Sequence, residues 1–205
     1  MRQIPLPLGT HAGASPSRIV VGSANGHVLD AFANAGDWPF RTAVLSGPPR
    51  SGKSVLADWF AQSGLGEAVD NADSADEAEL FHRWNRSQES GRPLLLIVNG
   101  AEAGWSIALP DLRSRLGAAL HLEIGALDDD MIAELLILHA EQRGFILGPD
   151  AAAYLVPRAE RSHLAIERLV AAIDRLSLER KQAPTMAIWR DALDEVTGDN
   201  AARLR

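Results

Sequence analysis

The sequence contains no cysteine, and only two of its 20 basic residues are lysines. The absence of cysteine excludes disulfides, thiolate nucleophiles and cysteine-ligated zinc. No apolar run approaches the roughly 18 residues that span a bilayer, and the N-terminus carries no apolar segment of the kind found in secretory signals. We therefore expect a cytoplasmic protein without a membrane segment.

An excess of positive charge is also missing. The chain has 27 acidic and 20 basic residues, a formal net charge of −7 and a pI near 5.3. Proteins that bind DNA tightly without reading its sequence need a basic surface, so this class of function is not expected. With 46% hydrophobic and 23% charged residues over 205 positions, the composition excludes wholesale disorder. The length suffices for one substantial domain with a small lid.

Strand-like and helix-like segments alternate up to residue 125. Apolar or β-branched runs at 18–21, 42–46, 94–98 and 120–124 are separated by stretches of helical periodicity. This order predicts an α/β fold with a parallel sheet and crossover helices. Beyond Gly125 every periodic stretch is helical, which predicts an appended helical bundle. The expected helices span 25–35, 54–62, 75–89, 128–143, 150–158, 163–180 and 186–196.

Residues 47–54, GPPRSGKS, match the phosphate-binding loop G-x-x-x-x-G-K-[ST] without a mismatch. Its glycines let backbone N–H groups surround phosphate oxygens, and the N-terminus of the next helix adds its dipole. We expect Lys53 to reach the β- and γ-phosphates and Ser54 to bind Mg²⁺. A chance glycine-rich loop is the alternative, but a buried strand precedes the loop and an amphipathic helix follows it. The nucleotide contacts expected from the loop are Gly47, Pro48, Arg50, Ser51, Gly52, Lys53, Ser54 and Val55.

A phosphate loop of this kind needs an acidic partner for the metal at the end of another strand. Asp70 is the candidate ligand beside Ser54, with Asp73 as the alternative and a plain acidic turn as the other interpretation. Fifteen residues between Ser54 and Asp70 leave room for one helix and a turn but not for a second crossover. We therefore expect the sheet to lack one edge strand. Asn71 stands where many such ATPases carry a second carboxylate, and an amide cannot accept a proton from the attacking water.

Taken in order, these landmarks resemble the AAA+ domain of the bacterial replication initiator DnaA. The segment VGSAN (21–25) is similar to the VGSSN-type opening of that domain, and the phosphate loop follows at a similar distance. The resemblance covers about residues 18–197 and implies an AAA+ base followed by a helical lid. Its later landmarks are LFHRWN (80–85), LLLIV (94–98) followed by Asn99, and LPDLRSRL (109–116).

The resemblance implies roles for individual residues. Val21 and Asn25 would lie near the adenine. Arg115 would act as an arginine finger that faces the nucleotide of a neighbouring subunit, although an intramolecular ion pair is the alternative. Asn99 would be a sensor residue that orients a water, or it would simply cap the end of its strand.

The phosphate-sensing arginine of the lid is less clearly placed. Alignment puts Ala165 or Glu167 at the expected position, so Arg168 or Arg161 would have to replace the family's arginine. Either arginine could instead be a solvated helix residue. Asp128 and Asp150 are expected to cap the first two helices of the lid.

Two features point, within this family, to the Hda-like regulators of initiation. The sequence ends after the predicted lid, whereas the initiator continues into a helix-turn-helix DNA-binding domain. QIPLPL (3–8) resembles the QLxLPL-type peptide by which Hda-like proteins bind the β sliding clamp, with proline limiting the unbound conformations and leucines filling a pocket. A proline-containing tail without function is the alternative. The expected clamp contacts are Gln3, Ile4, Leu6, Pro7 and Leu8.

The resemblance therefore implies an adenine-nucleotide-binding AAA+ regulator that uses ADP or ATP and Mg²⁺. It would dock on the sliding clamp, promote hydrolysis of initiator-bound ATP through its arginine finger, and so suppress replication initiation. A homodimer is possible, and sequence-specific DNA binding is not expected. The alternatives are a self-contained P-loop ATPase that assists replication or loading, and a purely structural nucleotide-binding adaptor. The expected parts are a clamp-binding peptide with its linker (1–17), the base (18–125) and the lid (126–205).

Overall fold

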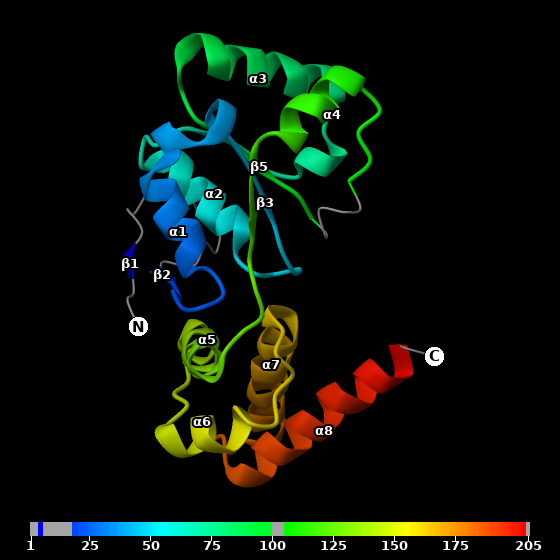
Figure 1. The fold of residues 1–205 in the computed structure, drawn as a ribbon. Coiled ribbons are helices and arrows are strands. Elements are labelled where there is room, and N and C mark those ends of the chain that lie inside the picture. The colour runs from blue at the N-terminus through cyan, green and yellow to red at the C-terminus, as the bar shows by residue number, and fades with distance from the viewer. Residues whose placement is uncertain (1–3, 6–17, 100–104, 204–205) are drawn as a thin grey trace. The chain divides into compact units, whose positions relative to one another are not determined.

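The computed structural model of this chain describes residues 4–5, 18–99 and 105–203 (Figure 1). The chain divides into two compact units, Met1–Gly125 and Ala126–Arg205. Within the described ranges, no helix has both the length and the apolar character that crossing a membrane requires.

The first unit is built on a four-stranded parallel sheet in the order β4-β5-β3-β6. The strands are β3 (Thr42–Ser46), β4 (Glu67–Val69), β5 (Leu94–Ile97) and β6 (Leu120–Glu123). Both central strands are fully buried, as expected for a parallel sheet that is covered on both faces. The predicted short parallel sheet is confirmed, with β4 at the edge beside β5 and β6 at the other edge.

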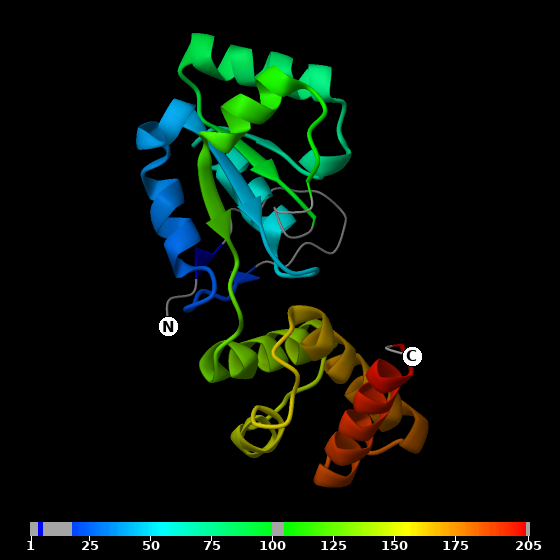
Figure 2. The ribbon, with the colours of Figure 1, turned by 45° about the vertical axis from the view of Figure 1, so that its right-hand side comes forward.

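Helices cover the two faces of this sheet. Helices α3 (Glu77–Ser90) and α4 (Pro110–Gly117) lie together on one face (Figures 1 and 2), where Leu80, Leu112 and Leu116 pack with apolar side chains of β3 and β5. Helices α1 (Gly26–Ala33) and α2 (Lys53–Gln62) contribute a second apolar group. In that group the rings of Phe32, Trp38 and Phe60 contact one another with centroid distances of 5.0–6.0 Å.

The strand expected at 18–21 is shorter in the structure and belongs to a different sheet. Strand β2 (Arg18–Ile19) pairs antiparallel with β1 (Ile4–Pro5) and not with the main sheet. The turn at 22–25 soon follows this run, so the run is too short to pair with the strands of the parallel sheet. The expected linker, 9–17, lies outside the described residues.

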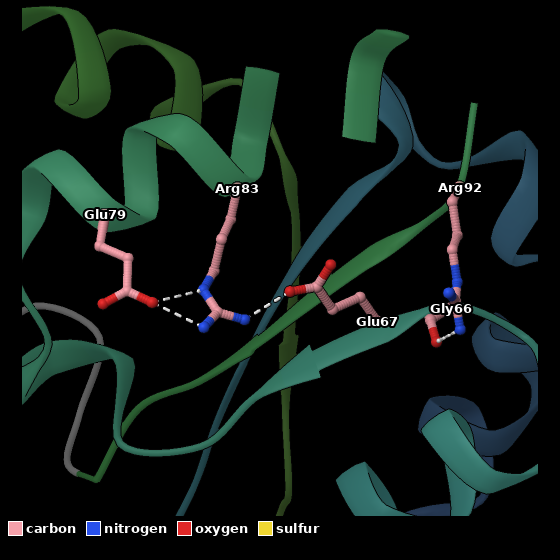
Figure 3. A network of polar contacts seen from close by, with 5 residues as sticks. All are labelled: Gly66, Glu67, Glu79, Arg83 and Arg92. Carbon is pink, nitrogen blue, oxygen red and sulfur yellow. Dashed lines mark hydrogen bonds and ion pairs between the residues drawn. The ribbon is translucent and has the colours of Figure 1, made fainter. Parts of the chain in front are cut away.

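A polar network joins the edge strand to helix α3 (Figure 3). Arg83 of α3 donates from Nη1 to Glu67 Oε1 (2.5 Å) and from Nε and Nη2 to Glu79 Oε1 (3.0 and 2.6 Å). Close by, Arg92 Nη2 donates to Gly66 O (3.1 Å). An edge strand exposes unpaired backbone groups that can recruit other chains. In this protein the edge is three residues long and is flanked by charged side chains.

The second unit is helical. Its helices are α5 (Asp129–Gln142), α6 (Pro149–Leu155), α7 (His163–Arg180) and α8 (Met186–Arg203). Asp128 caps α5 as predicted, because its side chain accepts a hydrogen bond from Met131 N (2.7 Å). The predicted cap of α6 is wrong: Gly148 is the N-cap, Pro149 opens the helix and Asp150 lies in its first turn. Proline suits the first helical position, since its missing N–H has no partner there.

Candidate functional site

The phosphate loop lies between strand β3 and helix α2. Gly47 has φ +150°, and a Cβ built on it would lie 2.9 Å from Ile124 Cβ at the end of β6, so a side chain would not fit. Gly52 has φ +86°, and Arg50 also adopts a positive φ of 64°. The loop therefore turns sharply between a buried strand and a helix N-terminus, which is the context that the motif requires.

The side chain of Lys53 lies against the backbone of the loop. Its Nζ donates to the backbone carbonyls of Gly47 and Pro48, both at 2.8 Å. The residue is only 5% exposed, and burial lowers the pKa of its ammonium group, while Asp70 and Asp73 partly oppose this shift. Phosphate oxygens would offer this buried cation acceptors that carry a full negative charge.

Two serines of the loop have different surroundings. Ser51 is buried, and its Oγ has no hydrogen-bond partner among the described residues. Buried hydroxyls are normally paired, so this orphaned group fits a site for phosphate oxygens. Ser54 is exposed in the first turn of α2, where its hydroxyl is accessible to a metal ion. Pro48 and Val55 are half-buried beside them.

The predicted metal carboxylate follows the edge strand. Asp70 is exposed directly after β4, and its Oδ1 accepts a hydrogen bond from Asn71 N (2.9 Å). Within the described part of the chain, no cluster of three or more His, Cys, Asp or Glu could hold a metal by itself. Mg²⁺ bound with a nucleotide needs only one or two protein oxygens, because phosphates and waters complete its shell. Ser54 and Asp70 are therefore suitable residues to hold it.

Asn99 connects the ends of β4 and β5. Its backbone N–H donates to Asp73 Oδ2 (3.2 Å), and its side-chain Nδ2 donates to Asn71 Oδ1. The other carboxylate oxygen of Asp73 is buried without a partner among the described residues. Asp73 thus supports the turn that carries Asn71, in addition to lying near Lys53. The predicted sensor residue is exposed next to this turn.

The segment expected near the adenine forms a tight turn. Asn25 is 3% exposed, and its Nδ2 donates to Val20 O (2.8 Å) while its Oδ1 accepts from Gly22 N (3.0 Å). Its side-chain amide thus holds the backbone of residues 20–25, which includes the half-buried Val21. Asn25 therefore shapes this segment with Oδ1 and Nδ2, the same two side-chain atoms that would make a direct contact with a nucleotide.

Arg115, the predicted arginine finger, lies on the last turn of α4 and contacts helix α3. Its Cζ is 4.4 Å from the ring centroid of Phe81 and 4.2 Å from that of Trp84. Its Nη1 donates to Asn85 Oδ1 (2.6 Å). The alternative of an intramolecular ion pair does not hold among the described residues, since aromatic faces and an amide surround the guanidinium.

The contact of Arg115 with three side chains of helix α3 was not predicted from the sequence. Phe81, Trp84 and Asn85 were expected only as part of the family landmark LFHRWN (80–85). Their spacing of three and four places them on one face of a helix, which is the signal that could have identified them. Which residue of another element contacts this face depends on how α3 packs against α4. The spacing of residues along α3 does not reveal this packing.

The two candidate lid arginines differ in their contacts. Arg161 donates from Nη1 to Leu127 O (3.0 Å) and from Nη2 to Asp129 Oδ1 (2.5 Å). Arg168 is half-buried on α7. Arg161 therefore has a structural partner at the start of α5, and Arg168 stays the predicted phosphate-sensing residue. Of the expected clamp contacts, Gln3, Leu6, Pro7 and Leu8 lie outside the described residues, and Ile4 is in β1.

Comparisons with known proteins match the helical unit to a family model and most of the chain to a relative. A family model for the lid domain of Hda matches residues 128–193. An uncharacterized protein of Haemophilus influenzae is 31% identical over 182 residues, which cover 84% of this chain and 78% of that protein.

Solved structures show the same fold at lower identity. Domain III of the Thermotoga maritima replication initiation protein DnaA matches with a TM-score of 0.70 and 13% identity, over 87% of this chain and 94% of that chain. The Thermotoga maritima RuvB Holliday junction branch migration motor matches with a TM-score of 0.61 and 18% identity, over 85% and 69%. AMPPCP-bound DnaA from Aquifex aeolicus matches with a TM-score of 0.58 and 16% identity, over 80% and 66%.

These findings agree with the resemblance seen in the sequence motifs. The structural matches establish an AAA+ fold, with the parallel sheet and phosphate loop in the first unit. The matched model covers most of the helical unit, and the relative in Haemophilus influenzae covers most of the whole chain. The chain therefore belongs to the Hda-like, DnaA-related AAA+ proteins.

Proposed function

We propose that this protein regulates replication initiation by offering Arg115 to the ATP that a DnaA subunit holds. The observation that supports this role most directly is the environment of Arg115. No carboxylate is paired with its guanidinium among the described residues, whereas Arg83 on the neighbouring helix is paired with two. An arginine finger needs a full positive charge at a defined position, because it stabilises the charge that develops during phosphoryl transfer.

The same proposal gives the protein's own phosphate loop a binding role. Lys53, Ser51 and the helix N-terminus of α2 are suited to hold the phosphates of ADP or ATP, with Ser54 and Asp70 holding Mg²⁺. Matched structures include DnaA bound to AMPPCP, which supports an adenine nucleotide as the ligand. Asn71 provides no general base beside the site, so we expect the protein to hydrolyse its own ATP slowly. Arg168 would contact the phosphates from the lid.

Clamp docking is the remaining part of the proposal. Residues 3–8 would bind the sliding clamp, which would concentrate the protein on DNA where replication has begun. The support is the sequence QIPLPL and its similarity to the clamp-binding peptides of Hda-like proteins. The clamp would then act as the signal that links ongoing replication to inactivation of the initiator.

The decisive experiment measures hydrolysis of DnaA-bound ATP with this protein, with and without DNA-loaded clamp. We expect clamp-dependent stimulation by wild type, and loss of most of it in Arg115→Ala, since a finger supplied in trans is worth on the order of 10³–10⁵ in rate. Arg113→Ala is the matched control, because Arg113 lies on the same helix but donates to Ile107 O (2.8 Å from Nε).

Two results would contradict the proposal. Full stimulation by Arg115→Ala would remove its central residue. A turnover of about 1 s⁻¹ or faster by this protein alone, within the ordinary range of enzymes, would instead indicate a self-contained ATPase. Melting temperatures of both arginine variants would show whether either acts through a loss of stability.

A further inference from the structure

Phe40 is a large hydrophobic side chain that a strained backbone holds in solvent. The residue is 54% exposed. It adopts φ 49° and ψ 28°, and Arg41 after it also has φ 49°. Two successive non-glycine residues in the left-handed region are unfavourable, and a bulky side chain there is rare. Strain of this kind persists only where surrounding contacts maintain it, and it is concentrated at functional positions.

Specific hydrogen bonds maintain this conformation. The carbonyl of Phe40 accepts from Thr42 Oγ1 (2.8 Å) and from Gln88 Nε2 of helix α3 (2.6 Å). Arg41 Nη1 donates to Gly36 O (3.3 Å). The exposed ring therefore has a defined position relative to α3.

Phe40 and the arginine finger contact the same indole. The ring of Phe40 lies 6.4 Å from that of Trp84, with 41° between their planes. The guanidinium of Arg115 lies 4.2 Å from the centroid of Trp84. An exposed aromatic ring and a guanidinium without a carboxylate partner among the described residues thus contact the same half-buried indole. We call these three side chains the Phe40–Arg115 surface.

We infer that Phe40 is a binding contact for the same AAA+ subunit, loaded with a nucleoside triphosphate, whose phosphates receive Arg115. This inference rests on the proposed function and adds a residue that determines partner affinity. Charge complementarity indicates the occupant: the surface presents a cation without a carboxylate partner among the described residues, and a triphosphate supplies the missing anion. A subunit that brings its triphosphate to Arg115 would therefore lie close to Trp84 and to the ring of Phe40. Aromatic residues and arginine dominate the energetics of protein interfaces.

The test compares Phe40→Asn with wild type, using ATP-loaded DnaA and DNA-loaded clamp. Asparagine adopts the left-handed conformation more readily than phenylalanine, so the variant should fold with an unchanged or higher melting temperature. We expect the concentration for half-maximal stimulation of ATP hydrolysis to rise at least about fivefold. The maximal rate at saturation should be preserved, because Arg115 is intact. Phe40→Tyr should behave like wild type.

Ile146→Asn is the matched control, since Ile146 is 86% exposed but belongs to the other unit. An unchanged half-maximal concentration in Phe40→Asn, with active wild type, would overturn this inference and leave the proposed function standing. Absence of stimulation by wild type would overturn the proposed function itself. If Phe40→Asn changes only self-association, measured by sedimentation, the surface binds a second copy of this chain and the inference is wrong.

Discussion

Lys53 and Arg83 are basic side chains of the same unit, but their surroundings shift their pKa values in opposite directions. Burial lowers the pKa of Lys53, whereas the hydrogen bonds that the Arg83 guanidinium donates to Glu79 and Glu67 raise its pKa. Desolvation disfavours a charge that has only neutral partners, and a paired carboxylate favours it. Lys53 donates to neutral carbonyls that an anionic ligand could replace, whereas Arg83 is already paired with two carboxylates.

Because the pKa of Lys53 is lowered, the unfolding free energy of the protein without nucleotide should change with pH in the alkaline range. The unfolded chain holds this proton up to its ordinary pKa of 10.5, while the folded protein releases it at lower pH. Stability contributed by this group therefore rises as pH increases through the lowered pKa. We expect the unfolding free energy of wild type, relative to Lys53→Met, to increase as the pH rises towards 10.5 in metal-free buffer. A constant difference, measured by denaturant titration, would contradict this prediction.

Asp70 and Asp73 should respond differently to replacement by asparagine. Asp70 is exposed and accepts a hydrogen bond from the N–H of Asn71, so Asp70→Asn should weaken Mg²⁺-dependent nucleotide binding about tenfold without lowering the melting temperature. Asp73 Oδ2 accepts the N–H of Asn99, so Asp73→Asn should lower the unfolding free energy by about 1 kcal/mol. Calorimetric binding with Mg²⁺ and with EDTA, combined with denaturation, distinguishes the two. A reversed pattern would make Asp73 the metal ligand.

Helix α3 is the element that organises the first unit. Its apolar residue Leu80 packs towards the sheet, Arg83 holds the edge strand, and Phe81 with Trp84 holds Arg115. At its start, Glu77 accepts hydrogen bonds from Ala108 N (2.8 Å) and Leu109 N (2.6 Å), just before α4. One helix thereby contacts both the edge strand that leads to Asp70 and the side chain of Arg115.

The link between α3 and the edge strand should be measurable as stability. Arg83 is 34% exposed at its side chain, so solvent screens its ion pairs, and Arg83→Met should lower the unfolding free energy by only about 0.5–1 kcal/mol. The loss should shrink in high salt. Arg86→Met on the same helix, where Arg86 is exposed, is the control and should have little effect. Equal losses for both variants at low salt would show that the pairs with Glu67 and Glu79 contribute nothing specific.

At the scale of the whole molecule, the chain separates binding tasks along its length. The proposed clamp peptide precedes the base, the base holds the phosphate loop and Arg115, and the helical unit carries Arg168. The pairing of Ile4–Pro5 with Arg18–Ile19 places part of the peptide next to the strand that leads to Val21. We therefore ask whether changes in the proposed peptide affect the base.

Replacing Gln3, Leu6 and Leu8 together by alanine provides that test. We expect clamp binding to weaken at least about 100-fold, because the directional and apolar contacts are lost together. The melting temperature and nucleotide affinity should stay unchanged. Surface-based clamp binding and calorimetric nucleotide titration measure the two properties on one preparation. Retained clamp binding would remove the peptide's role, and a lowered nucleotide affinity would show that β1 supports the base.

Local patterns were sufficient for the class of the fold and for the phosphate loop. The buried strands at 42–46 and 94–98 and the loop at 47–54 could be read from the sequence, because parallel-sheet strands are continuous apolar runs and the loop has a strict spacing. The absence of a further strand between α2 and β4 also followed from the number of residues, since the 15 residues between Ser54 and Asp70 are too few for another crossover. The cap at Asp128 was local in the same way.

Contacts between distant segments could not be obtained in this manner. The pairing of β2 with β1, the bonds of Asp73 and Asn71 to Asn99, and the aromatic contacts of Arg115 each join residues that are from 13 to 34 positions apart. Periodicity states which face of a helix is apolar but not which residue arrives there from another element. Packing of α3 against α4 and the sheet determined whether Arg115 met a carboxylate or an indole, and with it the charge that the protein presents to a partner.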